Sequence, residues 1–132
     1  MSCIFCEIAS HQAPAYILYE DEEVIAFLDK YPITEGHTLV LPKQHYSRFD
    51  DVPEPLVAKI FRVVQKFNGK IRESMNSTAA HISINDGVAA NQLVPHTHVH
   101  IIPRREKDDA SFAFRKRLSS EQMEEIQKRI SL

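Results

Sequence analysis

Histidine and aliphatic residues alternate near the end of the chain, and this alternation constrains the fold more than any other feature. Residues 94–103 have the sequence V-P-H-T-H-V-H-I-I-P. Side chains of a β-strand point alternately to the two faces of its sheet. A strand over residues 95–102 therefore places three imidazoles on one face, those of His96, His98 and His100, and turns the residues between them toward the core, against a helix.

Three imidazoles about 6 to 7 Å apart on one strand face are compatible with two kinds of chemistry. In the first, two or three of them bind a metal ion that keeps an open position for water, as in hydrolases. In the second, one neutral imidazole, whose ordinary pKa lies near physiological pH, attacks phosphorus and forms an adduct that water hydrolyses. The spacing alone does not distinguish them.

Short runs rich in β-branched and aromatic residues predict four further strands. These runs lie at residues 17–19, 24–28, 37–41 and 82–84. The acidic stretch between the first two indicates a hairpin, and Pro42 is expected to end the third strand.

From Glu54 onward the apolar residues follow a helical period and form one stripe: Leu56, Ile60, Val63, Val64, Phe67 and Ile71. Asp50 or Asp51 is the expected N-cap, and Pro53 or Pro55 suits the first turn. A short helical turn over residues 3–10 and a C-terminal helix over residues 120–130 complete the predicted elements. This order predicts an α+β domain over residues 1–132, with an antiparallel five-stranded sheet, one long helix and a short C-terminal helix.

Composition excludes several classes of protein. The 132 residues suffice for one core, and 43% hydrophobic with 26% charged residues is typical of a folded chain rather than a disordered one. The formal charge of −2 offers no basic surplus for duplex nucleic acid. No apolar run approaches the roughly 20 residues needed to cross a bilayer, and no secretion signal is apparent. We therefore expect a cytoplasmic protein without a membrane partner.

Four segments resemble the histidine-triad (HIT) superfamily, in the order that the family has them. Residues 96–102 match its His-φ-His-φ-His-φ-φ motif, with threonine at the first φ position. The other matches are C-I-F-C-E-I at residues 3–8, A-F-L-D at 26–29 and G-H-T-L-V-L-P-K at 36–43. The resemblance covers nearly the whole chain and implies a single HIT domain that is usually a homodimer.

The resemblance also implies an activity. HIT proteins are nucleotide-binding hydrolases or transferases that act on the α-phosphate of purine nucleotide derivatives, such as dinucleoside polyphosphates or nucleoside phosphoramidates of adenosine. The middle triad histidine is their nucleophile, which assigns a covalent nucleotidyl-histidine intermediate to His98. His100 and His37 would donate hydrogen bonds to the non-bridging oxygens.

Further site residues follow from the same resemblance. Asp29 corresponds to the ribose ligand, and Asn85 and Gln92 are expected near the phosphate and ribose, although Asn85 also suits a plain turn. The expected walls of the purine pocket could equally be core, and they are Ile4, Phe5, Phe27 and Leu28.

Two positions bear on the branch of the family. Leu93 stands where the phosphoramidase branch usually has a serine that assists the leaving amine, which argues against that branch. The ending Ile102-Pro103-Arg104-Arg105 resembles the dinucleoside-polyphosphate branch. Arg104 and Arg105 could then meet a polyphosphate, or they could be solvated surface residues.

Cys3 and Cys6 have the C-x-x-C spacing, which without a secretion signal favours a metal half-site or a redox pair over a structural disulfide. The resemblance to zinc-binding HIT proteins implies that His45 and His96 complete a structural zinc (Zn2+) site. The alternative is a pair of reduced cysteines beside the pocket wall.

Two alternatives to the covalent mechanism remain open on the sequence. One is a zinc-dependent hydrolase whose metal is held by His96, His98 and His100. The other is a non-catalytic module on the same fold that senses nucleotides or binds a protein partner.

Overall fold

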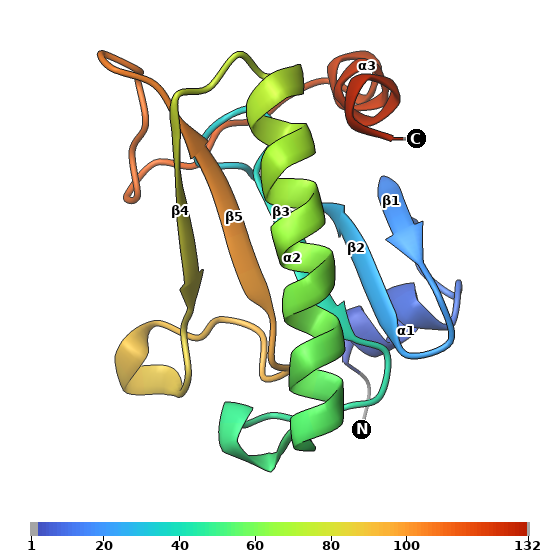
Figure 1. Cartoon of the computed structure of the whole chain (residues 1–132). Helices are drawn as coiled ribbons and strands as arrows, with labels where there is room; N and C mark the ends of the chain where they lie inside the picture. The colour runs from blue at the N-terminus through green and yellow to red at the C-terminus, as the bar shows by residue number, and fades with distance from the viewer. Residues whose placement is uncertain (1–2, 132) are drawn as a thin grey trace.

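The structure, a computed structural model, describes residues 3–131 and is built on one antiparallel sheet of five strands (Figure 1). The strands are β1 (Ile17–Glu20), β2 (Val24–Leu28), β3 (Thr38–Pro42), β4 (Ala79–Ile84) and β5 (Val99–Arg104). Their order in the sheet is β1-β2-β3-β5-β4, so β5 lies beside β3 and β4 forms an edge. The predicted α+β fold and its five-stranded antiparallel sheet are confirmed, whereas the domain limits at residues 1–132 stay a prediction.

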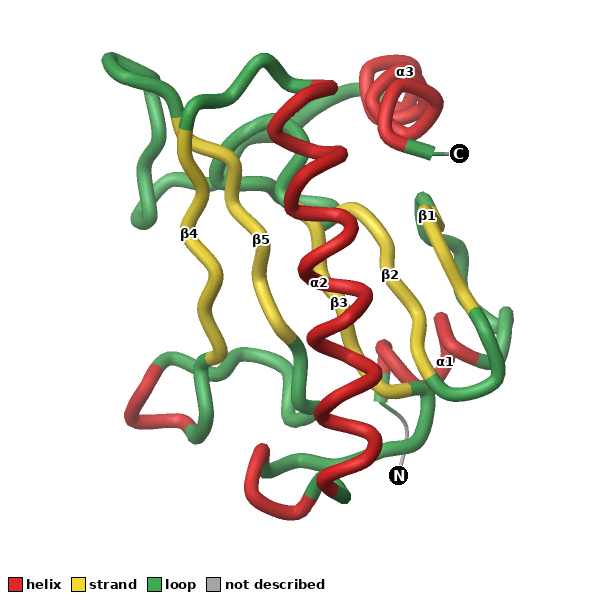
Figure 2. Tube along the Cα trace, in the orientation of Figure 1, coloured by secondary structure: helices red, strands yellow, loops and turns green. Residues whose placement is uncertain are grey.

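Helices cover both faces of this sheet (Figure 2). The long helix α2 (Glu54–Ser74) crosses one face, and α3 (Ser120–Ile130) packs beside α2 and β1. The short helix α1 (Ile4–Ala9) lies on the opposite face, where its Phe5 and Ile8 pack against β2 and β3. No helix among residues 3–131 is both long and apolar enough to span a membrane.

The central strands are buried on both faces because each contributes to two cores. In β2, Val24, Ala26 and Leu28 join the core beneath α2, whereas Ile25 and Phe27 join the core beneath α1. The predicted apolar stripe of α2 is buried throughout, as its helical period requires. The α2 face is thus filled by apolar side chains, and the α1 face is where polar groups meet the sheet.

The start of α2 differs from the prediction. Its N-cap is Pro53, whose backbone is extended, and Asp50 and Asp51 belong to a separate 3-10 turn, η1 (Phe49–Asp51). The expected cap at Asp50 or Asp51 is therefore wrong, because this turn and the extended Val52 separate both aspartates from the helix. Pro55 does lie in the first turn, as predicted.

The start of β5 also differs from the prediction of a strand from residue 95. Sheet pairing begins at Val99, which lies opposite Val40 of β3 and Ile84 of β4. Upstream, the Thr97 amide donates to the Tyr46 carbonyl at 2.7 Å, and Pro95 has no amide hydrogen. The segment entering the strand therefore bonds to a loop rather than to the sheet.

Candidate functional site

A cavity of about 670 Å³ opens on the α1 side of the sheet, next to the histidine strand. Eight predicted site residues line it: Ile4, Phe5, Phe27, Leu28, Asp29, Asn85, His98 and His100. Its walls are mostly apolar, and its polar groups include residues at the start of β5, at the end of β2 and in the loops after β4 and β5, which is typical of small-molecule sites.

Two predicted site residues do not line this cavity. His37 is fully buried and lies behind His100, which it contacts through a hydrogen bond. Gln92 uses both ends of its amide elsewhere: Oε1 accepts from the Gly87 amide at 2.7 Å, and Nε2 donates to the Ser47 carbonyl at 3.0 Å. Gln92 therefore connects the loop after β4 to the loop after β3.

A backbone carbonyl determines which nitrogen of His98 is available. The His98 Nδ1 lies 2.6 Å from the His96 carbonyl oxygen, which can only accept, so Nδ1 carries the proton. Burial lowers the pKa of His98, so the ring is neutral near pH 7. Nε2 consequently holds a free lone pair, as a nucleophile requires.

A chain of hydrogen bonds also determines which ring nitrogen carries the proton in His37 and in His100. The Ile33 amide donates to His37 Nδ1 at 3.0 Å, so neutral His37 carries its proton on Nε2. That Nε2 donates to His100 Nδ1 at 2.9 Å, which leaves the His100 proton on its own Nε2. Among the described residues this buried Nε2 has no hydrogen-bond partner. A buried donor without an acceptor beside a cavity suits an anionic ligand.

Both of these histidines are held neutral in the folded protein. Burial, followed by the charge of the neighbouring ring, lowers the pKa of His37 well below its ordinary value. Burial also lowers the pKa of His100 to about 4. Gly36, directly before His37, has a φ of +92°, and a Cβ at this position would lie 2.6 Å from Met75 Cγ. A larger residue would therefore be strained and crowded here.

Asp29 follows β2, and each of its carboxylate oxygens accepts one hydrogen bond. Oδ1 accepts from the Tyr31 amide at 2.9 Å, and Oδ2 accepts from Arg115 Nη1 at 3.1 Å. Burial raises the pKa of this carboxyl, and its two hydrogen-bond donors act in the opposite direction. Each carboxylate oxygen retains a second lone pair, so the group can accept one hydrogen bond from each hydroxyl of a vicinal diol.

Arg115 lines the cavity and was missed by the sequence analysis. It lies in the loop between β5 and α3 and reaches Asp29 across 86 residues of chain. The only local signal is the basic run R-K-R at residues 115–117, which is equally typical of a solvated loop. By contrast, Arg104 donates two hydrogen bonds to Asp108, from Nε to Oδ2 at 2.8 Å and from Nη2 to Oδ1 at 3.0 Å. Neither Arg104 nor Arg105 lines the cavity.

A second cluster brings the four predicted zinc ligands together. One ligand atom from each residue lies within 4.8 Å of the others, and the set is Cys3, Cys6, His45 and His96. His96 Nδ1 is 3.6 Å from both thiol sulfurs, and His45 Nδ1 is 3.4 Å from Cys6 Sγ. Sulfur and nitrogen ligands of a tetrahedral zinc ion are separated by about 3.6 Å, so these residues fit the metal.

The protonation of His96 is compatible with this fit. Its Nε2 lies 2.7 Å from the Pro42 carbonyl, so Nε2 donates and Nδ1 presents its lone pair to the thiols. Burial lowers the pKa of His96 to about 4, which keeps the ring neutral. The set lies on α1, the loop after β3 and the segment entering β5, so a zinc ion there would tie three distant segments together.

The structure does not gather the three triad histidines around one point. The groups of potential metal ligands found among residues 3–131 are the cysteine and histidine cluster and a set of Asp29, His37 and His100. His96 belongs to the first, His100 to the second, and His98 to neither. This separation disfavours a metal held jointly by His96, His98 and His100.

Comparisons with known proteins show what this chain is similar to. The family profile described as HIT domain matches residues 10–107. An uncharacterized HIT-like protein of Saccharolobus solfataricus is 38% identical over 131 residues, covering 97% of this chain and 94% of the relative. An adenylylsulfatase of Arabidopsis thaliana, HINT3, is 38% identical over 106 residues, which are 80% of this chain and 54% of that protein.

Solved structures show the same fold. A zinc-bound histidine triad family protein from Mycobacterium smegmatis has a TM-score of 0.88 and 42% identity, covering 98% of this chain and 91% of that one. A hypothetical histidine triad nucleotide-binding protein from Sulfolobus tokodaii has a TM-score of 0.89 and 39% identity, covering 97% and 89% of the two chains.

Proposed function

This chain belongs to the HIT family, and from that membership we propose that it is a nucleotide hydrolase or transferase acting on the α-phosphate of purine nucleotide derivatives. The observation that carries the proposal is that two ring nitrogens at the cavity differ in protonation, one being an acceptor and the other a donor. His98 Nε2 offers a lone pair, and His100 Nε2 offers a buried N–H that has no acceptor among the described residues. A phosphoryl group needs both, an electron pair at phosphorus and a donor at its oxygen.

The reaction proceeds in two displacements. His98 Nε2 attacks the α-phosphorus, a P–N bond forms, and the bond to the leaving group breaks with its electron pair. Water then attacks the same phosphorus, the P–N bond breaks, and His98 returns to its neutral form as the water loses a proton. His100 donates to a non-bridging oxygen in both steps, and His37 holds His100 in the required tautomer.

The remaining cavity residues bind the nucleoside. Asp29 accepts from the two ribose hydroxyls through the lone pairs that Tyr31 and Arg115 leave free. The base lies against the apolar side chains of α1 and β2, including Phe5 and Phe27, whose rings pack edge to face with centroids 5.5 Å apart. Asn85 Nδ2 has only a long hydrogen bond of 3.4 Å to the Asn91 carbonyl, so it can turn to the phosphate.

A structural zinc ion is part of the proposal. When bound, it would crosslink Cys3, Cys6, His45 and His96 without taking part in the chemistry, because His98 remains outside that set. The fit of the donor distances and the zinc-bound relative from M. smegmatis support the assignment.

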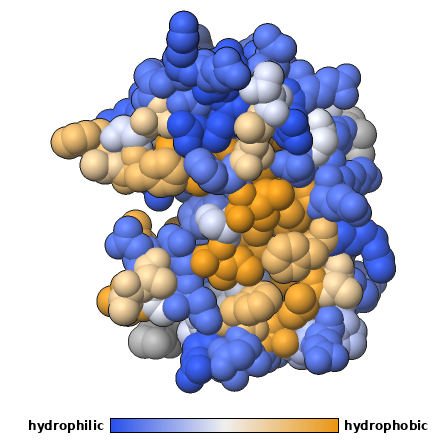
Figure 3. Space-filling model, turned by 60° about the vertical axis from the view of Figure 1, so that its left-hand side comes forward, coloured by the Kyte–Doolittle hydropathy of each residue, from blue (hydrophilic) through white to orange (hydrophobic). Residues whose placement is uncertain are grey.

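A homodimer is the proposed assembly. The edge strand β4 leaves Ile82 46% exposed, and Phe61 on α2 is 36% exposed. Figure 3, which brings this side of the molecule forward, shows apolar surface gathered there. An unpaired edge beside apolar surface favours association with a second copy. Light scattering should give the mass of two chains, and Ile82→Lys should shift it to one; a monomeric wild type contradicts the dimer.

The experiment that tests the activity is a turnover panel with wild type and His98→Ala. The panel contains diadenosine polyphosphates, adenosine phosphoramidates, nucleotidyl sugars and adenylyl sulfate, the last because of the HINT3 relative. Loss of the nucleophile should lower turnover by at least about a thousandfold. His11→Ala is the matched control, since His11 is exposed and pairs with Glu20 away from the cavity.

Three outcomes separate the candidate functions. Turnover that survives in His98→Ala contradicts the covalent mechanism. Turnover lost on removal of metal from a folded protein favours a zinc-dependent hydrolase. Nucleotide binding without turnover of any substrate in the panel favours the non-catalytic, nucleotide-sensing module.

A further inference from the structure

We propose that Arg115 is a specificity residue that binds the anionic group next to the α-phosphate, and that it selects phosphate-type or sulfate-type leaving groups over amines. This inference rests on the proposed function. Arg115 lies outside residues 10–107, the part of the chain that matches the HIT profile. The selectivity would therefore come from the loop between β5 and α3, outside the matched profile.

The position of Arg115 between two hollows is the first argument. A second hollow of about 290 Å³ adjoins the main cavity and shares with it Asn85, Asn91, Leu93, His100 and Arg115. His100 and Arg115 therefore lie where the two hollows meet. If His98 and His100 hold the α-phosphate, a leaving group that extends into the second hollow passes beside the guanidinium.

The free donors of Arg115 are the second argument. Its hydrogen bonds to described residues, 3.1 Å to Asp29 Oδ2 and 2.9 Å to the Tyr31 carbonyl, both use Nη1. Nη2 and Nε remain for a ligand, and the side chain is only 30% exposed. Because the Lys116 amide also bonds the Pro32 carbonyl at 2.8 Å, the loop is held against the rim. A guanidinium fixed in this way loses little conformational entropy when it binds an anion.

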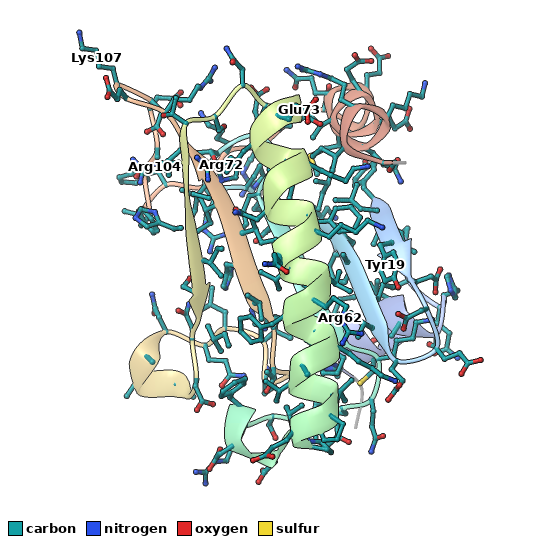
Figure 4. All side chains as sticks on the ribbon, in the orientation of Figure 1. Tyr19, Arg62, Arg72, Glu73, Arg104 and Lys107 are labelled. Carbon is teal, nitrogen blue, oxygen red and sulfur yellow. The ribbon has the colours of Figure 1, made fainter. Side chains whose placement is uncertain are left out.

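The other described lysines and arginines do not reach both hollows, and Lys30 lines the main cavity alone. Figure 4 shows Arg104 beside β4 and Lys107 at the tip of the loop, pointing away from the body of the molecule. Arg104 is neutralised by Asp108, Lys116 pairs with Asp109 at 2.7 Å, and Arg117 lies over the Tyr31 ring. Among residues 3–131, Arg115 is the one lysine or arginine that lines both hollows.

One further observation agrees with an anionic leaving group. Leu93 lines both hollows and is 78% exposed, and it has no hydroxyl with which to assist an amine.

The test compares AMP and ADP binding by calorimetry in wild type, Arg115→Gln, Arg115→Lys and Arg117→Gln. Wild type should bind ADP about tenfold more tightly than AMP, the increment expected for a charge-assisted hydrogen bond at a partly exposed site. Arg115→Gln should weaken ADP binding more than AMP binding and so remove that preference. Arg115→Lys should retain part of it, and Arg117→Gln, the matched loss of charge two residues away, should retain all of it.

The outcomes distinguish this inference from the proposed function. If wild type binds neither AMP nor ADP, the proposed function fails. If AMP binds but the ADP preference is missing in wild type or survives in Arg115→Gln, only the role of Arg115 is overturned. Equal weakening of AMP and ADP in Arg115→Gln also overturns it, because the arginine would then act only by supporting Asp29.

Discussion

Two clusters of potential metal ligands lie on the same side of the sheet, and their chemistry differs. The first contains Cys3, Cys6, His45 and His96, and the second contains Asp29, His37 and His100. In both, one ligand atom of each residue lies within 4.8 Å of the others. Distance alone therefore cannot tell a metal centre from a catalytic network.

The two clusters differ in the backbone group that bonds to the histidine, which is an acceptor at His96 and a donor at His37. His96 donates Nε2–H to the Pro42 carbonyl, which turns a lone pair toward the two thiols. His37 accepts the Ile33 amide on Nδ1, so its other nitrogen carries a proton and cannot bind a metal without losing it. A backbone acceptor thus leaves a lone pair on the opposite ring nitrogen, facing the thiols at His96 and the cavity at His98, whereas a backbone donor leaves His37 to pass a hydrogen bond onward.

The largest expected effect is loss of the first cluster. Cys3→Ser with Cys6→Ser should reduce zinc from about one equivalent per chain to a small fraction, because soft thiolate ligands hold the ion. We expect the free energy of unfolding to fall by on the order of 3 to 5 kcal/mol, since three segments lose their crosslink. Elemental analysis and urea unfolding measure the two effects. Zinc-free wild type purified without chelator would contradict the metal centre.

The second expected effect is on catalysis alone. His37→Phe keeps a ring but removes the donor that fixes the His100 tautomer, and kcat should fall about a hundredfold, as for loss of an oxyanion donor. Zinc content should not change. His45→Gln is the reciprocal control, because it should weaken zinc binding while leaving His100 in place. If each variant impaired both properties, the two clusters would not be separate centres.

The sequence predicted the parts of this arrangement that depend on local periodicity. The alternation around residue 98 places Val99 and Ile101 in the core beneath α2, as the strand period requires. The resemblance brought Cys3, Cys6, His45 and His96 into one set, which the structure also assembles. The stripe of α2 was equally predictable from its helical period.

The parts that sequence could not predict depend on distant partners. The start of β5 is set by the Tyr46 carbonyl, which takes the Thr97 amide away from the sheet. Gln92 is next to the triad segment, yet its amide is occupied by Gly87 and Ser47. Arg115 reaches the site only because a loop with no periodic pattern folds back onto Asp29.

A third expected effect is the pH dependence of stability that comes from the second cluster. Burial lowers the pKa of His100 to about 4, against 6.5 for an exposed histidine. Above pH 6.5 both folded and unfolded states are neutral at this residue. As the pH falls from 6.5 toward 4, the unfolded chain binds a proton that the folded chain does not, so stability decreases.

At pH 5 this loss amounts to about 2 kcal/mol for one such histidine. Urea unfolding of wild type and His100→Gln at pH 7 and pH 5 measures it, and the decrease should be smaller in the variant by that amount. Contributions from His96 and from zinc release occur in both proteins and cancel in the difference. Equal decreases would mean that His100 is protonated in the folded state and that the neutral hydrogen-bond chain is wrong.

The smallest expected effect concerns Phe5, which lies between the metal cluster and the nucleophile. Its ring contacts His98 edge-on with centroids 5.0 Å apart, and His96 with centroids 6.0 Å apart. Phe5→Leu keeps an apolar side chain but loses these ring contacts, which should cost about 1 kcal/mol of stability. Turnover should fall a few-fold because His98 gains freedom, while zinc content stays the same because its four ligands are untouched. A loss of zinc in Phe5→Leu would show that the two clusters are coupled through this ring, and the metal would then influence the nucleophile through packing alone.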